Sequence, residues 1–396
     1  MNAIPRLKPY AGPVLLSYGF RPFFLFGAIY AGLAVLAWLP IFNGELQPRT
    51  AFGAIDWHVH EMLYGYLPAV VTGFLLTAIP NWTGRLPIQG KPLLALVVVW
   101  LAGRVAVTVS AEIGWFAAAV IDAGFLTLLI AAVTREIVAG ENWRNLRVVV
   151  LVALLLVGNV AFHLESHFNG SVEYGARVGI AAMVLLITVI GGRIVPSFTR
   201  NWLVRENPGR LPAPIARFDV VVIGISAIAL AFWVAQPSWR LSGAALAIAG
   251  LLQVARLMRW AGDRTFRDRL VLVLHVGYAF VPLGFLLASA AAFGAVAASA
   301  GIHAWTVGAA GTMTLAVMTR ASLGHTGNAL VASATTQIIY AAVVIAALAR
   351  IGASVFPIWS EPLLELTVLA WCLAFFGFAA SFGSLLLGKK RAATAH

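Results

Sequence analysis

The sequence is poor in charge and almost free of cysteine. Only 11% of its 396 residues are charged, against about 25% in a typical soluble protein. The one cysteine, Cys372, lies in an apolar run, where a buried packing residue is the simplest interpretation. A single cysteine excludes an internal disulfide, a cysteine-rich zinc or iron–sulfur site and the C-x-x-C-H attachment of c-type haem. Any haem in this chain is therefore expected to be a non-covalently bound haem b.

The sequence also lacks a long polar segment. The longest one, 193–217, is too short for a soluble domain. The N-terminus leads into an apolar run without a small-residue cleavage site, so we expect no removable signal peptide. Apolar runs of about 18 residues or more recur along the chain, and 61% of all residues are hydrophobic. This pattern predicts an all-α integral membrane protein that forms a single polytopic domain over residues 1–396.

About twelve transmembrane helices are expected. Their predicted ranges are 22–40, 57–80, 92–110, 115–134, 148–164, 174–195, 218–236, 240–258, 270–292, 302–320, 331–350 and 362–387. Most of the 27 Lys and Arg fall in the N-terminus, in the even-numbered loops and the span ends next to them, and in the C-terminus. The exceptions are Arg49, Arg177, Arg240 and Arg350 in odd-numbered loops, and Arg104 within the third span. Because cytoplasmic loops are enriched in Lys and Arg, we expect both termini in the cytoplasm. The net charge of +12 then requires no nucleic acid as a partner.

Three span ends on the expected cytoplasmic side resemble one another: PNWTGR at 80–85, PSFTRN at 196–201 and SLGHTGN at 322–328. Aligning Thr83, Thr199 and Thr326 gives spacings of 116 and 127 residues, which is four helices each time. Chance is the alternative, since small and polar residues are common at helix ends. A real repeat would predict a pseudo-threefold arrangement of four-helix units, as in haem-copper oxidases.

The histidines are the main candidates for cofactor ligands, because imidazole binds copper and haem iron and ionisable residues within spans are functional candidates. Those near the expected periplasmic ends are His58, His60, His163, His167 and His303; those towards the cytoplasmic side are His275 and His325; His396 is terminal. We expect His58 and His60 to point about 200° apart on a helix. They would then serve two centres, unless the first turn is unwound and both reach one metal ion. The alternative to a ligand role is that both are interfacial histidines bonded to water or lipid headgroups.

Glu61 has three interpretations. It follows His58 at i+3 and could orient that imidazole as a carboxylate acceptor, it could relay protons, or it could simply complement the positive end of a helix dipole.

The other histidines each have a structural alternative. His163 and His167 are spaced for one helix face, although His167 is better explained as a loop residue. His303 opens a span rich in Gly, Ala and Thr, which suits either close helix packing or a haem slot. His275 either bonds a neighbouring helix or binds a metal ion.

Three arginines lie in or near the membrane. Arg193 and Arg320 are at the cytoplasmic ends of their spans, where they can reach the surface or pair with haem propionates. Arg104 is deeper and needs a carboxylate partner, for which Asp122 or Glu112 is the nearest candidate in sequence.

Several long blocks are similar to the NnrS family of bacterial nitric-oxide-response membrane proteins. They are FRPFFLFGAIYAGLAVLAW, WHVHEMLYGYLPAVVTGFLLTAIPNWTGR, GGRIVPSFTRNWL, LHVGYAFVPLG and HAWTVGAAGTMTLAVMTRASLGHTG. The resemblance implies a multi-pass protein of the bacterial inner membrane that contains haem and copper and protects against nitrosative stress. It also implies metal binding by the histidines in these blocks, His58, His60, His275, His303 and His325. His163 lies outside them and ranks lower.

The resemblance leaves two functions open. One is an oxidoreductase that consumes nitric oxide at a haem centre, with electrons from quinol or another membrane donor. The other is a non-catalytic metal-handling or transport protein that limits the formation of iron–nitrosyl species. We further expect one histidine of the His58/His60 pair and His303 to be the axial ligands of a haem between spans two and ten.

Overall fold

The computed structural model describes residues 10–388, and within that range every regular element is a helix. Eleven segments there are long and apolar enough to cross a membrane. The expected span at 302–320 is a twelfth, but it is broken into shorter helical pieces between Ala298 and His325. The prediction of an all-α membrane protein of about twelve spans is thus confirmed. His396 and the basic residues at both chain ends lie outside the described residues.

The chain divides into two compact units, each described separately below. Unit 1 comprises Met1–Gly179, Ala321–Asn328 and Phe375–His396, and unit 2 comprises Ile180–Arg320 and Ala329–Ala374. Each unit is a bundle of apolar helices whose backbone groups are bonded internally, as a lipid environment requires. The threefold arrangement remains a prediction.

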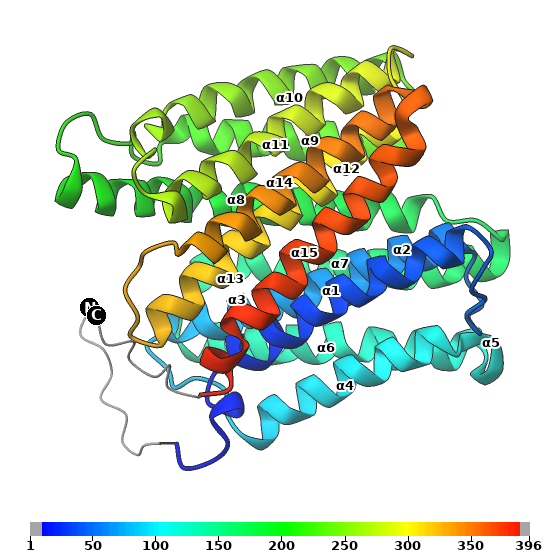
Figure 1. The fold of residues 1–396 in the computed structure, drawn as a ribbon, viewed down its shortest axis with the longest axis horizontal. Coiled ribbons are helices and arrows are strands. Elements are labelled where there is room, and N and C mark those ends of the chain that lie inside the picture. Colours follow the sequence, from blue (N-terminus) through cyan, green and yellow to red (C-terminus); the bar gives the residue numbers. More distant parts are fainter. Residues whose placement is uncertain (1–9, 389–396) are drawn as a thin grey trace. The chain divides into compact units, whose positions relative to one another are not determined.

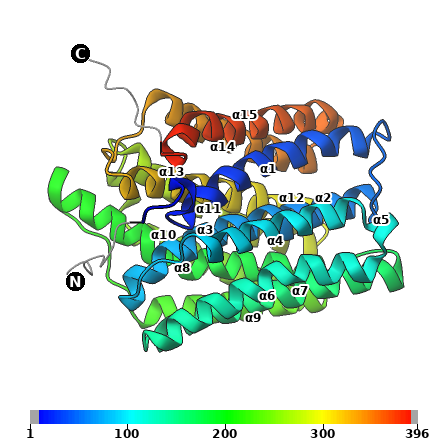
Figure 2. The ribbon, with the colours of Figure 1, turned by 90° about the horizontal axis from the view of Figure 1, so that it is seen from below.

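Unit 1 contains most of the N-terminal helices. These are α1 (Phe20–Phe42), α2 (Ala54–His60), α3 (Leu67–Thr83), α4 (Lys91–Thr108), α5 (Ser110–Ile113), α6 (Trp115–Ala139) and α7 (Leu146–Asn169). Within it, α6 packs against α4 and α7, and α1 packs along α3 (Figures 1 and 2). Two helices end at glycines with left-handed backbone, α3 at Gly84 and α7 at Gly170, a conformation that glycine adopts without steric cost.

Unit 2 contains α9 (Arg217–Ala235), α10 (Arg240–Met258), α11 (Arg269–Ala292), α12 (Ala298–His303) and α14 (Ala334–Val355). Three helices contribute residues to both units: α8 (Tyr174–Glu206), α13 (Thr312–His325) and α15 (Ser360–Leu386). Helix α10 packs between α9 and α11 (Figure 1). Side chains cap two helix starts: Asp268 accepts from the backbone of Leu270 and Val271 at α11, and Ser333 accepts from that of Thr336 at α14.

Small residues bring α7 and the start of α8 into backbone contact. A Cβ atom on Gly175 would stand 2.5 Å from the backbone nitrogen of Phe162 and 2.6 Å from its Cα. The hydroxyl of Tyr64 donates to the carbonyl of Gly175 at 2.7 Å in the same region. Because Phe162 precedes His163, this close crossing fixes the height and rotation of the helix that carries His163.

Spans two and ten share an unusual local structure. A π-helix runs over Glu61–Tyr66 directly after His60, and another over Ala304–Gly311 directly after His303. In both spans a threonine follows the histidine by 23 residues and donates to the carbonyl four residues earlier. The next residue is a glycine with positive φ, Gly84 at 72° and Gly327 at 75°. π-Helical turns are rare and often mark functional positions.

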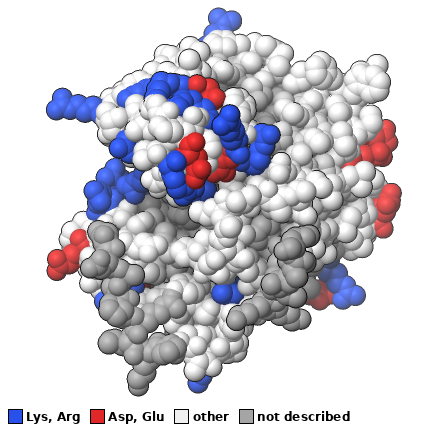
Figure 3. Space-filling model, turned by 60° about the vertical axis from the view of Figure 1, so that its left-hand side comes forward, with Lys and Arg blue, Asp and Glu red and all other residues white. Residues whose placement is uncertain are grey.

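Arginines gather at one end of unit 2, where α8 ends and α11 begins. Figure 3 shows this group, with a few acidic side chains among the basic ones. Arg264 donates to the carbonyls of Asn207 and Pro208 at 3.0 and 2.9 Å, and Arg210 pairs with Asp263. The arginine-rich loops are therefore folded against the helix ends. Their placement in the cytoplasm remains a prediction from the charge distribution.

Candidate metal centre

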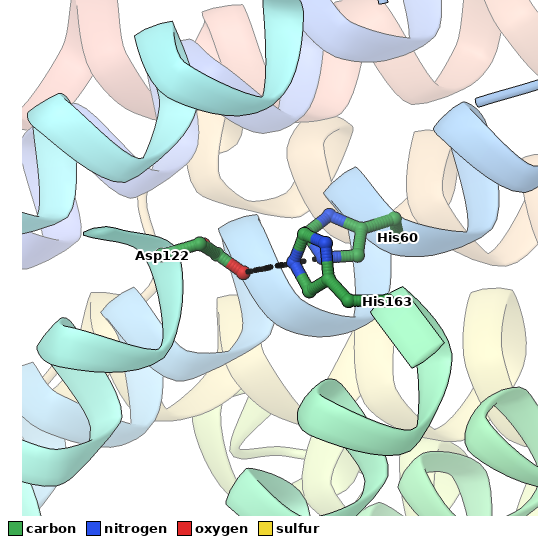
Figure 4. Close-up of side chains that lie close together, drawn as sticks. All are labelled: His60, Asp122 and His163. Atoms are coloured by element: carbon green, nitrogen blue, oxygen red, sulfur yellow. Dashed lines mark hydrogen bonds and ion pairs between the residues drawn. The ribbon is translucent and has the colours of Figure 1, made fainter. Parts of the chain in front are cut away.

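Three helices of unit 1 bring His60, Asp122 and His163 together (Figure 4). His60 ends α2, Asp122 lies in α6 and His163 lies in α7. One nitrogen or oxygen atom from each residue lies within 4.8 Å of those from the other two. All three residues are buried, with exposed fractions of 0%, 2% and 3%. Burying a carboxylate and two imidazoles in an apolar bundle is costly unless they are paired or bind a metal ion.

The neighbouring Glu61 determines which nitrogen of His60 faces the other two residues. His60 Nδ1 lies 3.0 Å from Glu61 Oε1. The same carboxylate accepts two bonds from Arg104 Nη1, at 2.7 and 2.8 Å, and another from the Tyr30 hydroxyl. An ionised carboxylate only accepts hydrogen bonds, so Nδ1 of His60 carries the proton. The other nitrogen, Nε2, then carries a lone pair.

That lone pair faces an oxygen atom. His60 Nε2 lies 3.2 Å from Asp122 Oδ2, yet it makes no hydrogen bond within the described part of the chain. Two lone pairs in contact repel each other unless a cation lies between them. His163 Nε2 is also 3.2 Å from Asp122 Oδ2. Two donors bound to one ion at about 2.0 Å and a tetrahedral angle are about 3.3 Å apart, so both spacings suit a shared metal ion.

The fixed charges around the three residues also suit a cation. Arg104 donates to Asp122 Oδ1 as well as to Glu61, and its side chain is only 5% exposed. Two carboxylates thus share one guanidinium, which leaves an excess negative charge inside the bundle. Because an uncompensated buried charge is strongly unfavourable, a bound cation would complete the charge balance.

Aromatic rings separate the centre from its surroundings. Phe52 lies with its ring centroid 5.0 Å from that of His60 and 5.3 Å from that of His163. Phe162 packs edge-on against His60 at 5.1 Å. These rings keep water from the imidazoles and hold their orientation. Two imidazole nitrogens and one carboxylate oxygen are donors suited to copper, iron or zinc.

The structure brings together only part of the predicted set. His60 and His163 meet, so His163 is more central than its position outside the shared motifs suggested. Glu61 accepts from His60, its immediate neighbour, where α2 passes into the π-helix; a role for Glu61 in orienting His58 or in relaying protons stays a prediction. Arg104 pairs with Asp122 as expected, whereas Glu112 pairs with Arg49 instead.

Asp122 and Asn159 were missed as members of the centre. Asn159 donates from Nδ2 to Asp122 Oδ2 at 2.8 Å. One available signal was the i, i+4 spacing of Asn159 and His163, which places two polar side chains on one face of an otherwise apolar helix.

His58 points away from His60. Its ring stacks on Trp38 of α1, with centroids 4.4 Å apart, while His60 packs among Phe52, Phe162 and His163. The expected divergence of the two histidines is confirmed, and the alternative of an unwound turn that lets both reach one ion is not what the structure contains.

The remaining predicted histidines lie elsewhere. His275 Nε2 bonds the hydroxyl of Thr199 on α8 at 2.8 Å, and a Cβ on Gly262 would stand 2.5 Å from its Nδ1. Of the two interpretations of His275, the structure therefore shows the hydrogen bond to a neighbouring helix. His303 donates from Nδ1 to the carbonyl of Ser299 at 2.7 Å. His325 packs against Tyr18 and Phe20, and His167 is exposed.

The two predicted propionate-binding arginines are both half-buried. The guanidinium of Arg320 lies over the ring of Phe198 at 4.2 Å, and its Nη1 is buried without a hydrogen-bond partner among the described residues. Arg193 lies on α8.

Comparison with known proteins agrees with the motifs. The family model described as NnrS protein matches residues 14–390, which is nearly the whole chain. A search of curated proteins finds no match. With this match along the length of a multi-pass helical chain, the protein belongs to the NnrS family of nitric-oxide-response membrane proteins.

Proposed function

We propose that this protein is a haem- and copper-binding protein of the bacterial inner membrane that protects against nitric oxide. We also propose that both termini lie in the cytoplasm, as the distribution of Lys and Arg predicts, and that nitric oxide and a membrane quinol are partners. The observation that carries the proposal is the buried His60–Asp122–His163 centre with its excess negative charge. Copper is proposed for it because the donor set suits this metal and the family resemblance implies it.

The chain's own residues have definite roles at this centre. Glu61 fixes the tautomer of His60 and so directs Nε2 towards the ion, and Arg104 holds both carboxylates in place. Such outer hydrogen bonds orient metal ligands and tune their basicity. Phe52 and Phe162 exclude water. A bound copper ion would supply one-electron chemistry.

For haem b, the candidate ligands are His58, His303, His275 and His325, since both nitrogens of His60 face carboxylates. His303 suits such a role because its Nδ1 donates to the carbonyl of Ser299, which fixes the orientation of the ring. Arg320 lies 17 residues further along the same span, roughly 25 Å away at 1.5 Å per residue. It therefore cannot reach the propionates of a haem on His303. Arg320 and Arg193 would need a haem near the other end of the spans, where His275 and His325 lie.

Metal analysis of purified protein and a reduced-minus-oxidised optical spectrum test the proposal. We expect copper and haem b in the wild type, loss of copper in His163→Ala, and unchanged copper in His167→Ala, the exposed histidine four residues later. Equal copper in both variants would contradict the assignment.

Nitric oxide consumption with a quinol analogue distinguishes the two functions. Turnover that disappears in His163→Ala supports quinol-linked reduction. A wild type that binds copper and nitric oxide without turnover supports the second candidate, a non-catalytic protein that limits iron–nitrosyl formation.

A further inference from the structure

The side chain of Asn159 reaches the metal centre with its amide nitrogen, while its amide oxygen is unsatisfied. Asn159 is fully buried, and its Nδ2 donates to Asp122 Oδ2 at 2.8 Å. Its Oδ1 has no hydrogen-bond partner in the described residues. An unpaired buried polar atom is unfavourable. Asn159 lies on the helix face that also carries His163. Its amide nitrogen bonds Asp122 Oδ2, the oxygen that both imidazoles approach.

We propose that the amide oxygen of Asn159 is a fourth donor to the ion at His60, Asp122 and His163, an inference that rests on the proposed function. Rotation of the amide about its terminal torsion, which is broad and roughly two-fold, exchanges Oδ1 and Nδ2. The oxygen then occupies the position 2.8 Å from Asp122 Oδ2 that the nitrogen holds now. The oxygens of Asn159 and Asp122 would repel each other at this distance, unless both bind the same cation.

The spacing fits that of neighbouring ligands on one ion. Donors at about 2.0 Å from a metal and at a right angle to each other are about 2.8 Å apart. The completed set is two imidazole nitrogens, one carboxylate oxygen and one amide oxygen. It contains no thiolate or thioether, the soft ligands that select copper(I), and nitrogen–oxygen sets of this kind suit copper(II). The inferred ligand of the centre is therefore copper in its oxidised state.

Electron paramagnetic resonance and chelator competition on the purified full-length protein, loaded with copper(II), test this inference. Asn159→Leu removes both polar atoms at similar volume. We expect it to bind copper(II) about 10-fold or more weakly and to change the copper spectrum. Asn159→Asp keeps an oxygen donor, so it should retain binding and show a third, distinct spectrum. Gln253→Leu is the matched control, since Gln253 is a fully buried amide in unit 2 and should change neither property.

The outcomes separate the inference from the proposed function. If the wild type and Asn159→Leu bind copper(II) equally and give the same spectrum, Asn159 is not a donor, while the three-residue centre stands. If the wild type itself binds no copper(II), the proposed function fails first. Should Asn159→Leu not fold, Asn159→Asp decides alone: a spectrum identical to that of the wild type overturns the inference.

Discussion

Removal of Arg104 should destabilise the protein more than removal of any exposed arginine. Its Nη1 donates to both oxygens of Glu61 at 2.7 and 2.8 Å, and its Nη2 donates to Asp122. In Arg104→Met, two carboxylates with side-chain exposures of 0% and 1% lose the guanidinium that pairs with both. Breaking a buried ion pair on one side costs about 3–5 kcal/mol, because the remaining charge stays buried. We expect a loss of that size in the free energy of unfolding.

Equilibrium unfolding in mixed detergent micelles, with a chelator present, measures this loss. Arg49→Met is the matched control: Arg49 pairs with Glu112 at 2.6 Å, but the two side chains are 77% and 49% exposed, so the expected cost is about 0–1 kcal/mol. The triple variant Arg104→Met, Glu61→Gln, Asp122→Asn removes all three charges and should recover most of the loss. If Arg104→Met costs no more than Arg49→Met, the centre is not the desolvated ion cluster described above.

Three further predictions concern the fold, the topology and the haem. Gly175→Ala should lower the free energy of unfolding by about 1–3 kcal/mol and reduce the copper content, because the added Cβ would meet the backbone of Phe162. Gly124→Ala is the control and should change neither property, since the nearest atom to its Cβ is 3.9 Å away. Equal unfolding free energies of the two variants would contradict this prediction. In a variant without Cys372, a maleimide added to the periplasmic side should label Arg49→Cys but not Arg210→Cys, and the reverse pattern would invert the topology. Acidified acetone should extract all haem, since C-x-x-C-H is missing from the sequence; haem that stays on the polypeptide would refute non-covalent binding.

The sequence was sufficient for the features that follow from local composition. The apolar runs predicted the spans, because a helix in lipid needs a sustained apolar stretch. The position of Arg104 predicted a carboxylate partner, because a cation in the membrane needs a nearby anion, and of the two candidates Asp122 and Glu112 the structure pairs it with Asp122. The divergence of His58 and His60 followed from helix geometry alone.

The composition of the metal centre was not predictable in the same way. Asp122, Asn159 and His163 meet His60 only because α6 and α7 pack beside the second span, and no sequence spacing encodes that meeting. The regular i+3 spacing offered His58 as one possible partner of Glu61. The chain leaves the α-helix at that point, and Glu61 bonds its immediate neighbour.

Spans two and ten each pass from a histidine directly into a π-helix. A π-helical turn is poorly stable by itself, so its occurrence after a histidine in spans two and ten needs a common cause. The two spans also agree in the distance from histidine to threonine and in the left-handed glycine that follows. If only the helix ends were similar by chance, there would be no reason for a π-helix to begin directly after a histidine 23 residues before the threonine in both spans. We therefore interpret the two spans as copies of one element, in which His303 occupies the position that His60 holds at the metal centre.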